Sequence, residues 1–531
     1  MSLNATPETA LTIHELITEA ASRYQQRPAL FDGKNQFTFA ELDKLSARVA
    51  KHFLKLGLKK GDVIAVQLPN TWEFVIAHLA AARAGLVFNP LSPNYRKNEL
   101  SYMLGHCETK ALITTNQLKG FRHDALAAEL KESLPALEHT IITGASEETD
   151  HINFYSFMKE DPVGIAEEDM EQNLPSMDDP AVIMFTSGTE SNPKAVLHTF
   201  QTFVPAHLMN GKEYKVTEED TILSVTPLCH MFSLPMIIIG MKYGAKQYLY
   251  RDYQVDTVID VLKRDSISFF IAAPAHLIDM IHHLRTIDRA DVKMRLILTG
   301  GTKIPAQMVK DLRELLDCSV GAQWGMTEVC AGTFTRPDDN PSYAWETVGK
   351  ATPAGEVIIV NDQYEQVPRG ETGEIAFKGE CLFKEYYKNE AATKEAFSES
   401  GYFLTGDQGW LDEKGYLHFV GRTKDTINRG GLKYHASEVE EALNMHPNIQ
   451  QSAVVSVPDP RLGERGCAYV SLRENKSFDL EEMKQYLLEK GFAKYKVPEF
   501  LEVRESLPAT PSGKISKGPL RKEAAHLQPS K

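Results

Sequence analysis

The chain has 531 residues, of which 42% are hydrophobic and 24% charged, and its formal net charge is -14. This length exceeds what one hydrophobic core accommodates, so at least two domains are expected. The negative charge and the lack of a sustained Lys/Arg stripe exclude a general nucleic-acid binder. The six cysteines are widely spaced, which favours reduced thiols in a cytoplasmic enzyme over disulfides or a thiolate metal site.

Neither a signal peptide nor a membrane span is expected. The first residues lack the charged start and apolar core of a signal peptide. The longest apolar stretch, around Met231 to Gly240, is interrupted by Ser233 and Pro235 and is too short to cross a bilayer.

The first 350 residues alternate helical and strand patterns. The pairs Thr12/Glu15 and Thr38/Glu41 match the capping box, so each predicts the start of a helix. This alternation predicts mainly parallel, doubly wound sheets. Its other members are the expected strands Val63–Val66, Leu86–Phe88, Ala181–Phe185, Ser268–Ile271 and Cys318–Val320 and the expected helices Thr71–Ala84, Val258–Arg264 and Ala306–Leu316.

The pattern changes near Gly355. Short strands with close Gly and Pro punctuation predict a β-rich subdomain over about 355–423. A compact unit of mixed helices and strands follows from Lys424 to the C-terminus. The expected fold is therefore α/β, with a large domain over 1–423 built on doubly wound mixed sheets and a small α+β domain over 424–531.

A turn rich in hydroxyls and glycine follows the strand Ala181–Phe185. Its free backbone N–H groups and one lysine predict a phosphate-binding loop, although the spacing is not that of a Walker loop. An ordinary surface turn is the alternative. The expected phosphate ligands are Thr186, Ser187, Gly188, Thr189 and Lys194.

Four further motifs follow that turn in order, and together the five resemble the AMP-forming acyl-CoA synthetase, adenylation-domain and luciferase superfamily. The resemblance extends from about Thr12 to Arg521. It implies a small, mobile C-terminal lid domain that rotates about a hinge at Lys424. The four motifs are Trp324-Gly325-Met326-Thr327-Glu328, Thr405-Gly406-Asp407, Gly421-Arg422-Thr423-Lys424-Asp425 and Pro511-Ser512-Gly513-Lys514.

The resemblance implies catalytic roles that suit the chemistry. A carboxylate that attacks the α-phosphate of ATP brings two anions together, and the enzyme must neutralise both. Lys514 matches the lysine that bridges them, although a solvated lysine in a basic tail is the alternative. Glu328 matches the Mg²⁺ ligand, since a hard cation prefers carboxylate oxygen. His230 and Thr186 complete the catalytic set.

The resemblance also assigns binding roles. Thr327 would donate to the α-phosphate, Trp324 would stack on adenine, and Asp407, supported by Arg422, would accept from the ribose hydroxyls. Gly430 and Gly431 would lie along the pantetheine tunnel, or would form only a turn. The expected acid-binding residues are His230, Met231, Phe232, Gly300 and Gly325.

Three positions in and beside the phosphate loop depart from the family pattern. Relatives usually carry Thr-Gly where this chain has Glu190-Ser191, and usually Gly where it has Ala195. A carboxylate in a phosphate loop repels the ligand unless it points away, is protonated or helps to hold Mg²⁺.

The resemblance and the acid-binding segment together predict an ATP-, Mg²⁺- and CoA-dependent ligase. Ser224–Gly240 contains no Asp or Glu to pair with a substrate amine, which favours an uncharged fatty, alicyclic or aryl acid. Lys494-Tyr495-Lys496-Val497-Pro498 looks more like the acyl-CoA ligases than the peptide-synthetase domains. Loading of a separate acyl carrier protein is the alternative acceptor reaction. A luciferase-like oxygenase and an inactive ATP-binding regulator are less favoured, and no oligomeric state is predicted.

Overall fold

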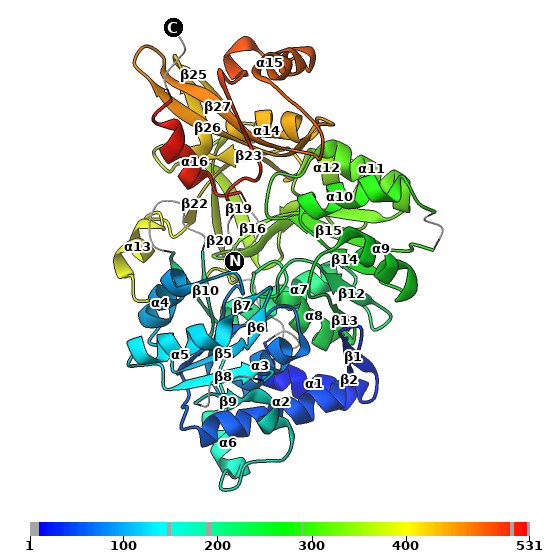
Figure 1. The fold of residues 1–531 in the computed structure, drawn as a ribbon, viewed down its shortest axis with the longest axis vertical. Coiled ribbons are helices and arrows are strands. Elements are labelled where there is room, and N and C mark those ends of the chain that lie inside the picture. Colours follow the sequence, from blue (N-terminus) through cyan, green and yellow to red (C-terminus); the bar gives the residue numbers. More distant parts are fainter. Residues whose placement is uncertain (1–9, 146–149, 187–192, 289–290, 510–514, 528–531) are drawn as a thin grey trace. The chain divides into compact units, whose positions relative to one another are not determined.

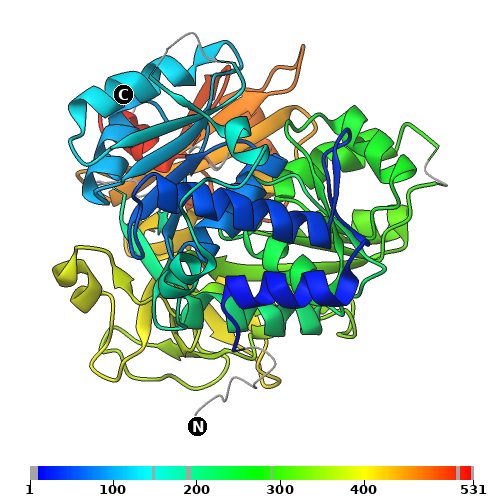
Figure 2. The ribbon, with the colours of Figure 1, turned by 90° about the horizontal axis from the view of Figure 1, so that it is seen from below.

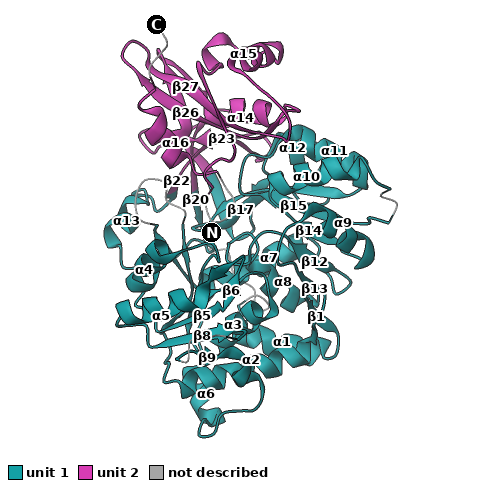
Figure 3. Cartoon of the chain, viewed as in Figure 1, with its two compact units in different colours: residues 1–186, 193–357, 377–403 teal, residues 187–192, 358–376, 404–531 magenta. Residues whose placement is uncertain are grey.

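A computed structural model describes residues 10–145, 150–186, 193–288, 291–509 and 515–527. The chain divides into two compact units (Figure 3). The first contains residues 1–186, 193–357 and 377–403, and the second is built mainly from 358–376 and 404–531. The predicted domain boundary at Lys424 lies inside the second unit and stays a prediction.

An eight-stranded sheet forms one half of the first unit. Its central strands pair parallel, whereas β11 and β21 extend one edge in antiparallel fashion. The parallel strands are buried along their length, as expected where helices cover both faces. In spatial order the strands are β21 (Glu385–Tyr386), β11 (Ala195–Thr199), β10 (Pro180–Phe185), β4 (Val87–Pro90), β3 (Val63–Gln67), β5 (Ala111–Thr115), β8 (His139–Thr143) and β9 (Ile152–Asn153).

A nine-stranded sheet forms the other half. Six strands, from β16 to β1, pair parallel, and antiparallel strands close both edges. In spatial order the strands are β18 (Lys350–Ala351), β17 (Cys330–Phe334), β16 (Ser319–Met326), β15 (Leu296–Gly300), β14 (Phe269–Ile271), β12 (Thr221–Ser224), β13 (Lys246–Leu249), β1 (Pro28–Phe31) and β2 (Gln36–Thr38).

Helices cover both sheets (Figures 1 and 2). Both predicted capping boxes are confirmed: Thr12 caps α1, Thr38 caps α2, and the two helices lie side by side. The helices of the first unit are α1 (Ile13–Tyr24), α2 (Phe39–Lys55), α3 (Trp72–Arg83), α4 (Lys97–His106), α5 (His123–Ser133), α6 (Glu167–Asn173), α7 (Phe200–Glu213), α8 (Pro235–Tyr243), α9 (Val255–Arg264), α10 (Pro274–Leu284), α11 (Ala306–Leu316), α12 (Tyr343–Glu346) and α13 (Glu390–Glu395).

The predicted β-rich segment forms a four-stranded sheet. Its strands, in spatial order, are β19 (Gly355–Val360), β20 (Gly373–Gly379), β22 (Phe403–Leu411) and β23 (Leu417–Arg422). A second sheet follows in the chain, and β28 pairs parallel with its β27. Its members and helices are β24 (Thr426–Arg429), β25 (Leu432–His435), α14 (Ala436–Asn444), β26 (Ile449–Asp459), β27 (Gly463–Leu472), α15 (Leu480–Glu489), β28 (Phe500–Arg504) and α16 (Lys517–Ala524).

Each unit has its own apolar core. In the first unit, β12, β14 and β15 pack against α9, α10 and α11 through side chains such as Phe270, Leu277 and Leu312. In the second, α14 and α15 cover β26 and β27 through Val439, Val470 and other buried side chains. The α/β class and the mixed sheets are confirmed.

Candidate active site

The predicted phosphate loop connects two antiparallel strands. Phe185 of β10 lies opposite Ala195 of β11, and the Thr186 N–H donates to the carbonyl of Lys194 at 2.9 Å. The predicted loop residues between these ends, Ser187, Gly188, Thr189, Glu190 and Ser191, lie outside the described residues, as does Lys514.

Glu328 lies in the turn between β16 and β17 and is only 8% exposed. The hydroxyl of Tyr386 donates to Glu328 Oε1 at 2.9 Å, and the N–H of Phe383 donates to the Glu328 carbonyl at 2.9 Å. Both partners are more than 50 residues away in sequence. The carboxylate is thus oriented by contacts that no local motif encodes.

His198 of β11 holds the same turn. Its Nε2 donates to the carbonyl of Thr327 at 2.8 Å, while Nδ1 lies 3.1 Å from Thr202 Oγ1. Burial lowers the pKa of His198 to about 4, so the imidazole is neutral near pH 7 and keeps this single donor. Lys194, which precedes β11, has its ammonium 4.4 Å from the centre of the Tyr386 ring. The structure therefore brings Lys194, Thr327 and Glu328 into one network.

The neighbouring glycine is required by the sheet. A Cβ on Gly325 would lie 2.1 Å from the carbonyl oxygen of Cys330 on the adjacent strand. Gly300 is similar, because its Cβ would lie 2.5 Å from the carbonyl of Gln323. These approaches explain both glycines, and a contact with the substrate carboxylate stays a prediction. Trp324 is 5% exposed, and its proposed stacking on adenine also remains a prediction.

Asn70 fixes the segment that leads to His230. Its amide Nδ2 donates to the Thr226 carbonyl at 3.1 Å, and its Oδ1 accepts from the Leu228 N–H at 2.7 Å. The hydroxyls of Ser224 and Ser233 lie 2.8 Å apart across the same segment. A buried polar frame therefore shapes this loop from within.

The apolar residues of that loop belong to the core. Met231 is 9% exposed, and Phe232 packs against the cluster that contains Met236 and Ile239. His230 is partly buried, and its N–H donates to the Pro227 carbonyl at 3.1 Å. The acid-binding roles of His230, Met231 and Phe232 stay predictions.

The second unit brings together Asp407 and Arg422. They lie opposite each other on β22 and β23, with Arg422 Nε 3.1 Å from Asp407 Oδ1. The Asp407 N–H donates to Thr405 Oγ1 at 3.1 Å, so the tripeptide is ordered by its own hydroxyl. Burial, opposed in part by a bond from Gly406 and assisted by the Asp407 charge, raises the pKa of nearby Glu374.

Gly430 and Gly431 form the two-residue turn between β24 and β25. Their φ angles are +62° and +89°, which L-residues with side chains rarely adopt. Lys424 lies in the short 3₁₀ turn Thr423–Asp425, where its carbonyl accepts from Arg521 at 3.4 Å. The hairpin geometry explains the glycines, and the pantetheine and hinge roles stay predictions.

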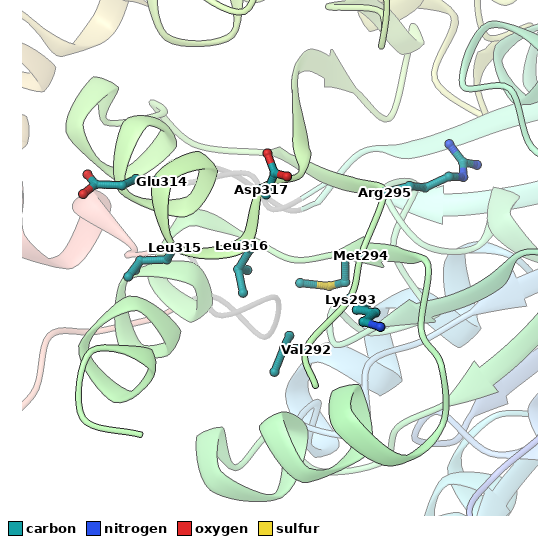
Figure 4. Close-up of a pocket in the computed structure, with 8 residues that line it drawn as sticks. All are labelled: Val292, Lys293, Met294, Arg295, Glu314, Leu315, Leu316 and Asp317. Carbon is teal, nitrogen blue, oxygen red and sulfur yellow. The ribbon is translucent and has the colours of Figure 1, made fainter. Parts of the chain in front are cut away.

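A shallow hollow of about 600 Å³ lies elsewhere in the first unit (Figure 4). It is lined by Val292–Arg295, which lead into β15, and by Glu314–Asp317 at the end of α11. Among the described residues, no group of three or more His, Cys, Asp and Glu side chains is arranged for a metal ion. No helix in the described part of the chain is long and apolar enough to cross a membrane.

Residues 17–387 match the AMP-binding enzyme family, and residues 438–514 match the AMP-binding enzyme C-terminal domain. The chain belongs to the AMP-binding enzyme family. It is therefore an AMP-forming ligase, and its Glu328 turn and hydroxyl-rich loop ends belong to the longer of the two matched regions.

Several characterised relatives match nearly the full chain. The medium-chain fatty-acid–CoA ligase of Escherichia coli is 31% identical over 92% of this chain and 86% of its own length. The 2,3-dihydroxybenzoate-AMP ligase of Bacillus subtilis is 30% identical over 96% of this chain and 93% of its own length.

Solved structures share the fold over the same extent. The o-succinylbenzoate CoA synthetase of Bacillus subtilis, solved with its acyl-adenylate intermediate, has a TM-score of 0.82 at 26% identity and covers 97% of this chain and 99% of that one. An anthranilate CoA ligase in complex with anthranoyl-AMP has a TM-score of 0.87 at 22% identity and covers 99% of both chains, which shows a common fold.

Sequence reasoning missed three residues that organise this site, namely Tyr386, His198 and Asn70. Each acts through a hydrogen bond to a residue between 58 and 158 positions away. Tyr386 lies within the predicted β-rich segment but belongs to none of the motifs, and His198 lies in a strand that carries no turn signature of its own. Only the tertiary pairing of β11, β21 and the Glu328 turn reveals them.

Proposed function

We propose that this enzyme is an ATP-dependent acid–CoA ligase that activates an uncharged fatty, alicyclic or aryl carboxylic acid through an acyl-adenylate. One observation carries the choice of acid: Ser224–Gly240 contains no Asp or Glu, and Asn70 holds this segment in place. A charged amine would lack a carboxylate partner there, whereas an apolar body gains about 0.8 kcal/mol per buried CH₂. The names of relatives that act on medium-chain fatty acid, salicylate and dihydroxybenzoate support this class.

The first half-reaction requires charge neutralisation around the α-phosphate. Lys194 supplies one cation at the end of β11, and the Thr327 hydroxyl supplies a neutral donor in the turn that His198 anchors. Lys514 is assigned the bridging position between the acid and the α-phosphate. The acid oxygen then attacks phosphorus, the acyl-adenylate forms, and pyrophosphate leaves with the displaced electron pair.

Mg²⁺ is part of this proposal, with Glu328 as its protein ligand. The fit rests on a single buried carboxylate rather than a cage of ligands, and Mg²⁺ commonly uses one or two carboxylates with phosphate oxygens and water. When bound, the ion neutralises phosphate charge. The Tyr386 hydroxyl donates to Glu328 Oε1 and so fixes the orientation of this carboxylate.

In the second half-reaction the CoA thiol attacks the acyl carbonyl, a C–S bond forms and AMP leaves. We assign the change between half-reactions to rotation at Lys424, and the approach of pantetheine to the Gly430–Gly431 turn. Both residues of that turn are glycines, so no side chain of theirs obstructs the thiol arm. Asp407 and Arg422 hold the ribose in both steps.

A stand-alone enzyme that loads a carrier protein is the second candidate, because the relatives include proteins named as AMP ligases as well as CoA ligases. We also assign the enzyme to the cytoplasm. All six cysteines are free and buried, and burial raises the thiol pKa of Cys107, Cys229 and Cys381 to about 12, which suits reduced structural thiols.

A carboxylic-acid panel tests this function. Octanoate, cyclohexane carboxylate, benzoate, salicylate and several amino acids are incubated with Mg-ATP, and AMP is measured with and without CoA. We expect CoA-dependent AMP turnover with one uncharged class. Turnover confined to amino acids would contradict the proposed acid, and adenylate formation that CoA never consumes would favour a carrier protein.

A further inference from the structure

The segment Phe383–Tyr387 links two parts of the candidate site. The Phe383 N–H donates to the Glu328 carbonyl at 2.9 Å, and the Tyr387 N–H donates to the Ala195 carbonyl at 2.7 Å. Ala195 begins β11 and directly follows Lys194. This one segment therefore holds the Glu328 turn beside the strand that carries the loop lysine.

Tyr386 lies at the centre of that link and is only 4% exposed. Its hydroxyl donates to Glu328 Oε1 at 2.9 Å, and its ring lies under the Lys194 ammonium, 4.4 Å from Nζ to the ring centre. A single side chain therefore contacts a candidate metal ligand and a candidate phosphate ligand. The two contacts use different parts of it, the hydroxyl and the ring face.

The ring has little freedom to move. Its backbone pairs with Val196 in the sheet, and the ring lies 4.7 Å from that of Phe383, which stacks in turn on Phe397. A donor fixed in this way orients its acceptor without losing much side-chain entropy on binding.

The hydroxyl is a permanent donor. A tyrosine phenol is protonated at neutral pH, and the Tyr386 hydroxyl donates to Glu328 Oε1. A hydrogen bond from a neutral hydroxyl to a carboxylate is stronger than one between two neutral groups, and it leaves the carboxylate the negative charge that a cation requires.

We propose that Tyr386 is a positioning residue for adenylation: its hydroxyl aims Glu328 at the magnesium ion of Mg-ATP, and its ring supports Lys194 against the phosphates. This inference rests on the proposed function. It divides the side chain into two separable tasks, because the hydroxyl should control the Mg²⁺ requirement and the ring should control ATP affinity.

The chain supplies a matched control. Tyr402 donates to Glu356 Oε1 at 2.8 Å, and the Lys378 ammonium lies 5.3 Å from the centre of its ring. The three residue types and both contacts are the same, but here the glutamate is exposed and the tyrosine half-buried, and the set contains no predicted site residue. Tyr402→Phe removes the same hydrogen bond from the same kind of carboxylate.

The experiment measures ATP binding by titration calorimetry at a series of Mg²⁺ concentrations. We expect Tyr386→Phe to raise the Mg²⁺ concentration for half-maximal ATP affinity by about tenfold, as is typical when the partner of a metal ligand is removed. Affinity at saturating Mg²⁺ should be retained. Tyr386→Leu should lower ATP affinity even at saturating Mg²⁺, and Tyr402→Phe should match the wild type in both respects.

A double-mutant cycle with Glu328→Gln separates positioning from a general structural effect. If Tyr386 acts through Glu328, adding Tyr386→Phe to Glu328→Gln should shift the Mg²⁺ dependence no further. An unshifted Mg²⁺ requirement in Tyr386→Phe, beside a shifted one in Glu328→Gln, would overturn the inference and leave the proposed function intact. A wild-type chain that binds no Mg-ATP would overturn both.

Discussion

Two Lys–Tyr–Glu sets in the first unit have the same chemistry in different surroundings. Both lysines are exposed, but in Lys194–Tyr386–Glu328, the buried set, the tyrosine and glutamate are 4% and 8% exposed, whereas in Lys378–Tyr402–Glu356, the exposed set, the tyrosine is half-buried and the glutamate exposed. Water competes for every contact of the exposed set and screens its charges. The buried set keeps its geometry and its field. Residue type therefore does not distinguish the candidate site from the surface, but burial does.

The glutamates should show the largest difference. We expect Glu328→Gln to slow acyl-adenylate formation by about 10²–10³-fold, the loss typical of one electrostatic stabiliser in a water-poor site. Glu356→Gln should leave the rate unchanged, because Glu356 is exposed and its hydrogen bond from Tyr402 involves no predicted site residue. Pyrophosphate release measured for both variants checks this, and equal losses would mean that burial is irrelevant.

A change at Lys424 should separate adenylate formation, which the buried set is proposed to serve, from thioester formation. Proline fixes φ near roughly −65° and should block the proposed rotation. We expect Lys424→Pro to form the acyl-adenylate at the wild-type rate while thioester formation from a supplied adenylate falls by more than about tenfold. Rapid-quench analysis of both steps is the measurement. If both steps persist, the hinge assignment is wrong.

The lysines should differ less than the glutamates. Lys194→Ala should raise the Michaelis constant for ATP by about tenfold, the value of one charge-assisted phosphate contact. Lys378→Ala should leave that constant unchanged. Initial rates at varied ATP decide between these outcomes, and a similar increase in both variants would point to a general effect of net charge.

Acid should destabilise the first unit through its buried histidines. Burial lowers the pKa of His78 to about 3 and of His198 to about 4, below the unfolded value of 6.5. Between the folded and unfolded pKa values, the unfolded chain therefore binds more protons than the folded chain. The stability that the neutral histidines confer is complete above pH 6.5 and is lost as pH falls toward 4. Burial also lowers the pKa of three other histidines, His123, His207 and His276.

Hydrogen exchange at pH 7 and pH 5 can compare the acid sensitivity of the two units. In the second unit, burial also lowers the pKa of His446. We expect amides around α3, α7 and β11 to lose more protection than those of α14 and α15. Equal losses in both units would contradict the assignment of acid sensitivity to these histidines.

Local signals predicted much of the fold. Thr12 and Thr38 encode their helix starts, and the apolar periodicity of Ala306–Leu316 gives the helix α11 at its observed bounds. The direction in which strands pair was harder to predict from the sequence. Nothing within Ala195–Thr199 distinguishes the antiparallel strand β11 from a parallel one, because direction depends on the partner strand.

In the candidate site, too, local motifs could be predicted from the sequence and tertiary contacts could not. The motif around Glu328 is contiguous and could be recognised, but the residue that orients its carboxylate could not. Tyr386 meets Glu328 only because β21 joins the sheet beside β11, a contact across 58 residues. Gly325 illustrates the opposite case, since a glycine assigned to the substrate is required by the backbone of Cys330.

A single-turnover experiment tests the central claim most directly. Enzyme in excess is mixed with a ¹⁴C-labelled acid from the productive class and Mg-ATP, quenched at intervals, and then supplied with CoA. We predict that label accumulates as acyl-adenylate before CoA is added and passes to acyl-CoA with release of AMP afterwards. Direct formation of thioester with no adenylate, or an adenylate that CoA leaves untouched, would contradict the assignment of this chain as an acid–CoA ligase.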